Sequence, residues 1–158
     1  MVDFIQLKMT STIRPALLSD APTLTAFNAA MALETEQLTL DPALLAAGVL
    51  AGLADPNKAR YFVAEADGRV VGQLMLTLEW SDWRNGVIWW IQSVYIEPSA
   101  RRQGVFTTLY RHVEQLAKAA GAVGLRLYVE QHNHAGQQTY KQLGMKLTEY
   151  RVMERMNL

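Results

Sequence analysis

The stretch from Val94 to Thr107 constrains the fold of this chain more than any other part of its sequence. It starts within an apolar run, residues 87–96, and breaks at Pro98, which disfavours helix at the residue before it and cannot donate to a sheet ladder. Two arginines and Gly104 follow, and apolar residues with helical spacing begin at Val105. The sequence therefore predicts a buried strand, a turn and a helix in close succession.

The predicted turn has the properties of an anion site. Arg101, Arg102, Gln103 and Gly104 precede the helix, whose first backbone amides have no partner within the helix. These amides and the helix dipole both favour negative charge. Glycine lets a ligand approach the backbone closely, and arginine matches the geometry of phosphate. The turn therefore favours an anionic ligand, with an ordinary helix start and solvated arginines as the alternative.

The rest of the chain shows the spacing of alternating strands and helices. Apolar periodicity and turn signals predict helices over residues 22–31, 42–54, 105–120 and 133–143, and strands over residues 13–16, 61–66, 70–80, 87–96, 125–129 and 147–153. The dipeptides Asp67-Gly68 and Asn85-Gly86 predict tight hairpin turns. Residues 87–96 are apolar on both faces, which indicates a central strand. We expect an α+β fold in a single domain, residues 1–158, with residues 1–11 as an N-terminal extension.

Composition and charge exclude several classes of protein. The chain has no cysteine, which excludes a disulfide framework, a cysteine-ligated metal and a thiol nucleophile. Its net charge of zero argues against general nucleic-acid binding. The longest uncharged apolar stretch, residues 42–54, is too short to span a bilayer, and the N-terminus has no signal-peptide pattern. We expect a cytoplasmic protein without nucleic-acid or membrane partners. The histidines show no metal-ligand spacing; they are His112, His132 and His134.

Charges of opposite sign are separated along the chain. Residues 1–98 carry 11 acidic and 6 basic side chains, whereas residues 99–158 carry 4 acidic and 9 basic ones. One interpretation is chance clustering on solvated faces. The other is an anionic cofactor bound by the C-terminal part and a cationic substrate facing the N-terminal part.

Two motifs of the chain resemble those of the GNAT superfamily of acyl-CoA-dependent N-acetyltransferases. The first, a V-x-P strand end followed by R/Q-x-x-G-x-G/A, here reads Ile96-Glu97-Pro98 and then residues 101–106. The second, N-x-x-A-x-x-x-Y-x-x-x-G-F, is represented by Asn133, Gly136, Tyr140, Gly144 and Met145. The motifs occur in order, and the resemblance covers residues 13–154. It implies a mixed, mostly antiparallel central sheet with helices on both faces.

The resemblance implies acetyl-CoA as co-substrate and no metal. Arg101 would add charge to a turn whose backbone amides hold the pyrophosphate; these amides belong to Arg102, Gln103, Gly104, Val105, Phe106 and Thr107. Phe106 departs from the family's small residue at its position. The pantetheine arm would lie along Val94, Tyr95 and Ile96, with the Val94 amide facing the thioester carbonyl. Asn133 and Tyr140 would border the cofactor from one face of the last helix.

The resemblance also bears on proton transfer. Tyr140 stands at the family's position for the general acid, and a phenol with a pKa of about 10 stays protonated at neutral pH; a core tyrosine is the alternative. Tyr128 stands where some family members carry a catalytic glutamate. Glu79 is the remaining candidate base, because a two-residue turn at Asn85-Gly86 would place it opposite Gln92, on the face shared with Val94. An exposed edge glutamate is an equal alternative.

The expected function is transfer of an acetyl group to a primary amine by direct attack. The acceptor, a small-molecule or peptide amine, would meet Glu79 together with Glu34 and Glu36, which we expect on an acidic loop between the first two helices. Four tryptophans crowd one hairpin, as core, as a homodimer surface or as an aromatic wall around the amine; they are Trp80, Trp83, Trp89 and Trp90. A non-catalytic acyl-CoA-binding sensor is the rival function. A nucleotide-binding domain is disfavoured because both phosphate-loop motifs are missing.

Overall fold

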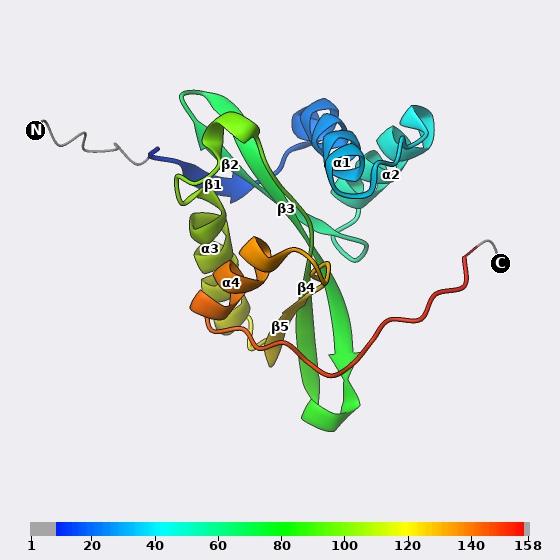
Figure 1. Cartoon of the computed structure of the whole chain (residues 1–158), viewed down its shortest axis with the longest axis vertical. Helices are drawn as coiled ribbons and strands as arrows, with labels where there is room; N and C mark the ends of the chain where they lie inside the picture. The colour runs from blue at the N-terminus through cyan, green and yellow to red at the C-terminus, as the bar shows by residue number, and fades with distance from the viewer. Residues whose placement is uncertain (1–8, 157–158) are drawn as a thin grey trace, which may run out of the picture. The chain divides into compact units, whose positions relative to one another are not determined.

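The computed structural model describes residues 9–156 of the chain (Figure 1). The chain divides into two compact units, Met1–Tyr128 and Val129–Leu158, and each is described by itself. The expected N-terminal extension, residues 1–11, lies almost wholly outside the described residues. The single domain expected over residues 1–158 stays a prediction.

The first unit is built on one five-stranded sheet whose strands follow each other in chain order. The strands are β1 (Thr12–Pro15), β2 (Arg60–Ala66), β3 (Arg69–Ser81), β4 (Gly86–Ile96) and β5 (Gly124–Leu127). Neighbouring strands are antiparallel except for β4 and β5, which are parallel. The mixed, mostly antiparallel sheet expected from the sequence is therefore confirmed.

Helices cover both faces of this sheet. They are α1 (Ala21–Glu36), α2 (Pro42–Ala54) and α3 (Val105–Ala119), with α1 and α2 on one face and α3 on the other (Figure 1). Side chains of β2 alternate between the two layers, as the pleat requires. Tyr61 and Val63 pack in one core cluster with Leu24 of α1, whereas Phe62 meets the ring of His112 on α3 with centroids 5.6 Å apart. The expected α+β class is confirmed.

Two predicted elements differ from the structure. The first helix continues to Glu36 rather than ending near Met31, because Ala, Leu and Glu favour helix and Gln37 closes it in a left-handed conformation with φ of 54°. Glu34 and Glu36 therefore lie in its last turn and not on a loop. Residues 147–153, predicted as a strand, form none, because no described strand pairs with them.

The two hairpin signals have different outcomes. Asp67-Gly68 forms the expected tight turn, with φ of 50° and 72° between paired Ala66 and Arg69. Asn85-Gly86 does not, since Ser81 pairs with Gly86 and a 3-10 turn over Asp82–Arg84 completes the loop. Gly86 is already part of β4, and a Cβ there would clash with the side chain of Val123. This glycine therefore serves close packing, and the register that we expected from a two-residue turn is wrong.

Candidate cofactor and acceptor site

Strand β4 parts from β5 in its second half. The parallel pairing runs from Ile88 with Gly124 to Ile91 with Leu127, where β5 ends. Among the described residues, Gln92–Ile96 therefore pair only with β3, and their other edge has no strand partner. A row of main-chain donors and acceptors without a strand partner can pair with an extended ligand. This fits the pantetheine arm that the resemblance implies at Val94, Tyr95 and Ile96.

A β-bulge lies in the same stretch. Met75 pairs with Gln92 and Gln73 with Tyr95, so Leu74 of β3 stands against both Ser93 and Val94. Ser93 has φ of 49°, a left-handed conformation that is uncommon for residues other than glycine. Bulges redirect the backbone and are over-represented next to active sites. The Val94 amide therefore belongs to a peptide that the regular ladder does not orient.

The bulge carries a contact that sequence reasoning missed. Gln73 of β3 is fully buried, and its Nε2 donates to Ser93 O at 3.1 Å and to Asn28 Oδ1 on α1 at 2.7 Å. The signal in the sequence was a lone glutamine inside an otherwise apolar stretch, residues 70–76. Its partner Asn28 is 45 positions away, so no local pattern could pair them.

The turn after β4 leads directly into α3. Pro98–Ala100 form a 3-10 turn, Arg102 has φ of 64°, and Gly104 has φ of 84° at the N-cap of the helix. A Cβ at Gly104 would meet nothing within 4 Å, so the backbone conformation rather than space calls for glycine. No side chain caps α3. An uncapped helix start favours an anion, which suits a pyrophosphate.

Arg101 joins this turn to the end of α1. Its Nη2 lies 2.6 Å from Glu34 Oε2, its Nε donates to Ile96 O at 2.8 Å, and its guanidinium lies 5.3 Å from the ring of Tyr95. The Tyr95 hydroxyl donates to Glu34 Oε1 at 2.9 Å. The hydrogen bond from Arg101, and then that from Tyr95, lowers the pKa of Glu34. The structure thus pairs a predicted cofactor residue with a predicted acceptor residue, while Glu36 is exposed and outside this contact.

Glu79 lies in a different place from the one expected. It stands opposite Ile88, because the hairpin loop is longer than a two-residue turn. Six positions of β4 separate Ile88 from Val94, a span of about 20 Å. Its carboxylate accepts a hydrogen bond from Trp90 Nε1 and pairs with Arg126 at 3.2 Å. A role as base for Glu79 stays a prediction, and this separation from Val94 argues against it.

The remaining tryptophans of this hairpin divide between core and surface. Trp89 is buried, whereas Trp80 and Trp83 are 61% and 84% exposed. The ring of Trp90 lies 4.6 Å from that of Tyr128. The aromatic residues near Glu79 therefore form a cluster at the β4–β5 junction, and the exposed pair lies at the tip of the hairpin.

The second unit contains α4 (His134–Gln142), which carries the second motif. Asn133 caps this helix, with its Oδ1 accepting from the Gly136 amide at 2.8 Å. A Cβ at Gly136 would lie 2.7 Å from Asn133 Nδ2, so the glycine makes room for this cap. Burial raises the pKa of Tyr140, so its hydroxyl keeps its proton at neutral pH. Its role as general acid stays a prediction.

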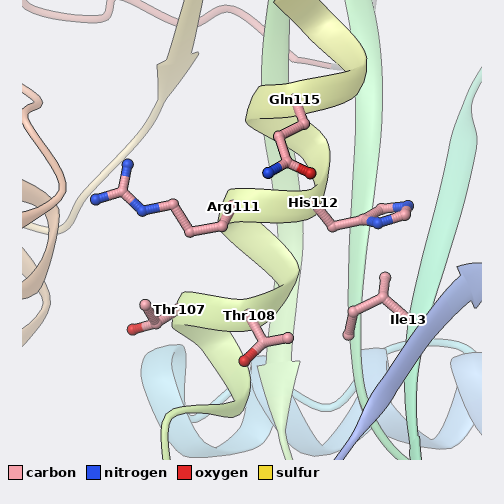
Figure 2. Close-up of a pocket in the computed structure, with 6 residues that line it drawn as sticks. All are labelled: Ile13, Thr107, Thr108, Arg111, His112 and Gln115. Atoms are coloured by element: carbon pink, nitrogen blue, oxygen red, sulfur yellow. The ribbon is translucent and has the colours of Figure 1, made fainter.

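A cavity of about 430 Å³ lies beside α3 (Figure 2). It is lined by Ile13 of β1 and by Thr107, Thr108, Arg111, His112 and Gln115 of α3. Of the predicted site residues only Thr107 borders it, and Arg111 forms an ion pair with Glu114 at 2.8 Å. The cavity is therefore distinct from the open edge of β4.

Between residues 9 and 156, no three His, Asp or Glu side chains come together as metal ligands would. None of the helices in the same range has the length and apolar character that crossing a bilayer requires.

Known proteins resemble this chain in sequence and in structure. The model of the acetyltransferase (GNAT) family matches residues 24–145. A solved structure from Clostridium difficile 630, described as a possible acetyltransferase, is 40% identical with a TM-score of 0.86, covering 94% of this chain and 98% of that one. A ribosomal-protein-alanine N-acetyltransferase from Brucella melitensis biovar Abortus 2308 has a TM-score of 0.77 at 17% identity, covering 94% and 100% of the two chains, which shows the fold alone.

A curated protein is also similar over part of its length. It is a Bacillus subtilis (strain 168) protein named "Putative [ribosomal protein bS18]-alanine N-acetyltransferase", and it is 33% identical over 88 residues. The match covers 56% of this chain and 54% of that protein, so it spans about half of each. The family match covers most of the chain and includes both motifs that carried the resemblance. The chain therefore belongs to the acetyltransferase (GNAT) family.

Proposed function

We propose that this protein transfers an acetyl group from acetyl-CoA to a primary amine by direct attack of the amine on the thioester. The observation that carries the proposal is the continuity of two features in the first unit. The free edge of β4 at Gln92–Ile96 leads within a few residues to the uncapped start of α3 at Gly104. An extended arm that ends in a pyrophosphate needs a free strand edge to pair with, followed by a helix start that binds its negative charge.

The proposal assigns main-chain roles to most of the site. Acetyl-CoA supplies the activated acetyl group, and the Val94 amide donates to the thioester oxygen as negative charge develops there. Tyr95 and Ile96 pair with the arm, and the turn amides from Arg102 to Thr107 hold the pyrophosphate. Tyr140 donates the proton to the thiolate, and Asn133 keeps the start of α4 in place. Because Glu79 lies opposite Ile88, away from Val94, and is paired with Arg126, the amine loses its proton to solvent or to another group.

The acceptor is proposed as a small-molecule or peptide amine that approaches past Glu34 and Glu36. The names of two similar proteins point first to a peptide with N-terminal alanine. A cytoplasmic location and a homodimer remain part of the proposal. Purified protein with acetyl-CoA should release CoA with at least one member of a panel of polyamines, amino acids, aminoglycosides and alanine-starting peptides. Calorimetry with CoA tests cofactor binding separately.

A non-catalytic acyl-CoA-binding protein is the second candidate. The observation in its favour is that Glu79, the expected base, lies opposite Ile88 rather than Gln92, while Tyr128 stands where some family members carry a glutamate. CoA binding without amine-dependent CoA release over the whole panel would favour this candidate and contradict the transferase proposal.

A further inference from the structure

Gln73 is the polar side chain most deeply placed in the core. It is 0% exposed, and both hydrogens of its amide nitrogen are used, by Asn28 Oδ1 and by Ser93 O. Its own oxygen, Oε1, is buried without a hydrogen-bond partner among the described residues. The amide cannot turn over to relieve this, because Oε1 would then face two acceptor oxygens. Its orientation is therefore determined by the two contacts.

This arrangement is unfavourable for stability alone. A buried amide oxygen without a partner is rare, because the cost of removing it from water is not offset by a hydrogen bond. Ser93 adds a second unfavourable feature, because a serine with positive φ is held only by its surroundings. Both features meet at one carbonyl, that of Ser93. Backbone and polar strain concentrated at one peptide is a reason to look for a function of that peptide.

The peptide in question joins Ser93 to Val94. It is trans, since none of the described peptide bonds is cis. The carbonyl and the amide of a trans peptide are coplanar and point in opposite directions. Because Gln73 holds the Ser93 carbonyl at 3.1 Å, the Val94 N–H must point away from Gln73. A side chain in the core thus determines the direction of one main-chain donor at the open edge of β4.

We propose that Gln73, itself held by Asn28, is a positioning residue that aims the Val94 amide at the thioester oxygen. The inference rests on the function proposed for Val94. The stabilisation that a main-chain N–H gives to charge developing in the transition state depends strongly on the direction in which the N–H points. Loss of Gln73 should therefore lower kcat while leaving the binding of acetyl-CoA, which uses many other main-chain groups, nearly unchanged.

Gln73→Met tests this with little change in side-chain volume. Relative to wild type, we expect kcat to fall about 10- to 100-fold and the KM for acetyl-CoA to change less than about threefold. Val63→Ala is the matched control, because Val63 pairs with Gln73 in register and is equally buried, while its apolar side chain cannot hydrogen-bond the Ser93 carbonyl. It should destabilise the fold and leave kcat per folded molecule unchanged. Of two variants at the partner position, Asn28→Asp keeps an acceptor oxygen and should have a higher kcat than Asn28→Leu.

A second readout does not depend on catalysis. Amide hydrogen exchange of the peptide containing residues 92–96 should be at least about tenfold faster in Gln73→Met than in wild type, and unchanged there in Val63→Ala. Unchanged exchange in Gln73→Met would overturn the proposal whatever the activity. If the wild type released no CoA with any amine, the proposed function would fail while faster exchange still upheld the control of this peptide by Gln73. Equal losses of kcat in Gln73→Met and Val63→Ala would reduce Gln73 to a packing residue.

Discussion

Arg101 and Glu34 form an ion pair that links the turn before α3 to the last turn of α1. The Glu34 carboxylate therefore offsets the positive charge of Arg101, which we expected to act on the pyrophosphate of the cofactor. The same pair makes Glu34, on the proposed acceptor side, a neighbour of the proposed pyrophosphate cradle. Binding of the acceptor beside Glu34 should consequently change the affinity for the cofactor at the turn of Arg101 through this single ion pair.

Removing the charge of Glu34 should strengthen CoA binding. In Glu34→Gln the guanidinium of Arg101 is no longer neutralised, so we expect the Kd of CoA to fall about two- to fivefold at low salt and less at high salt. Glu36→Gln is the control, because Glu36 is exposed and has no ion pair among the described residues. Calorimetry at two salt concentrations measures both. Equal Kd values for the two variants would contradict the coupling.

Charge at Gly104 should decide cofactor binding. Gly104→Asp and Gly104→Asn have similar shapes and both residue types tolerate positive φ, but only Asp places a negative charge at the uncapped start of α3. We expect the Kd of CoA to rise at least about tenfold more in the Asp variant than in the Asn variant. Circular dichroism should show both variants folded. Similar Kd values would remove this turn from the cofactor site.

Tyr140 should matter for turnover. Tyr140→Phe removes the hydroxyl and should lower kcat by roughly 10²–10⁴, with little change in CoA affinity. Because burial raises the pKa of Tyr140 above its usual 10.0, the proton needed for catalysis should persist up to that pH and be lost only above it. A pH profile of kcat measures whether activity falls only on this alkaline side. Activity of Tyr140→Phe within about threefold of wild type would leave Tyr140 a packing residue.

Glu79→Gln should leave the pH dependence of kcat/KM unchanged. The carboxylate lies opposite Ile88 and is paired with Arg126, so it is not placed to take a proton beside Val94. A catalytic base would instead show its largest loss at low pH, where free amine is scarce. Arg126→Met provides the comparison, since it breaks the same ion pair while leaving the carboxylate. A selective loss at low pH in Glu79→Gln alone would restore Glu79 as the base.

Asp20 should stabilise the fold at neutral pH and lose this effect at strongly acidic pH. Its carboxylate receives two hydrogen bonds from Arg14, at 2.7 and 3.1 Å, and one from the Leu17 amide at 2.7 Å. The contact with Arg14 contributes most to lowering its pKa from the usual 3.8. The stabilisation is therefore complete above pH 3.8 and is lost as pH falls through the lower folded value. Asp20→Asn should cost about 1–3 kcal/mol at pH 7 and less near pH 3, measured by urea denaturation.

The parts of the fold that the sequence predicts correctly are those with local signals. The strand before Pro98, the turn at Gly104 and the positive-φ pair Asp67-Gly68 all follow from residues that permit few backbone conformations. The β3–β4 register does not, because Gly86 is required by Val123, a contact between segments distant in sequence. The mistaken two-residue turn predicted Gln92 as the partner of Glu79 on β4, whereas its partner is Ile88. This error placed the candidate base too close to Val94.

The candidate site shows the same limit. The two motifs located its main-chain parts, since they record special backbone geometry at Gly104 and a helix cap at Asn133. The contacts between Gln73 and Asn28, and between Arg101 and Glu34, join residues 45 and 67 positions apart. Neither pair has any local pattern that would announce it, because each depends on how α1 packs against the sheet.

The open edge of β4 has a consequence for how such a protein can change over generations. The backbone there offers the same donors and acceptors whatever the neighbouring side chains are. Under the proposed function, residues around the acceptor that do not contact the cofactor turn can therefore change while the main-chain groups that bind acetyl-CoA remain. A gene copy of this protein could acquire a new amine partner through a few substitutions near the end of α1, without first losing its chemistry.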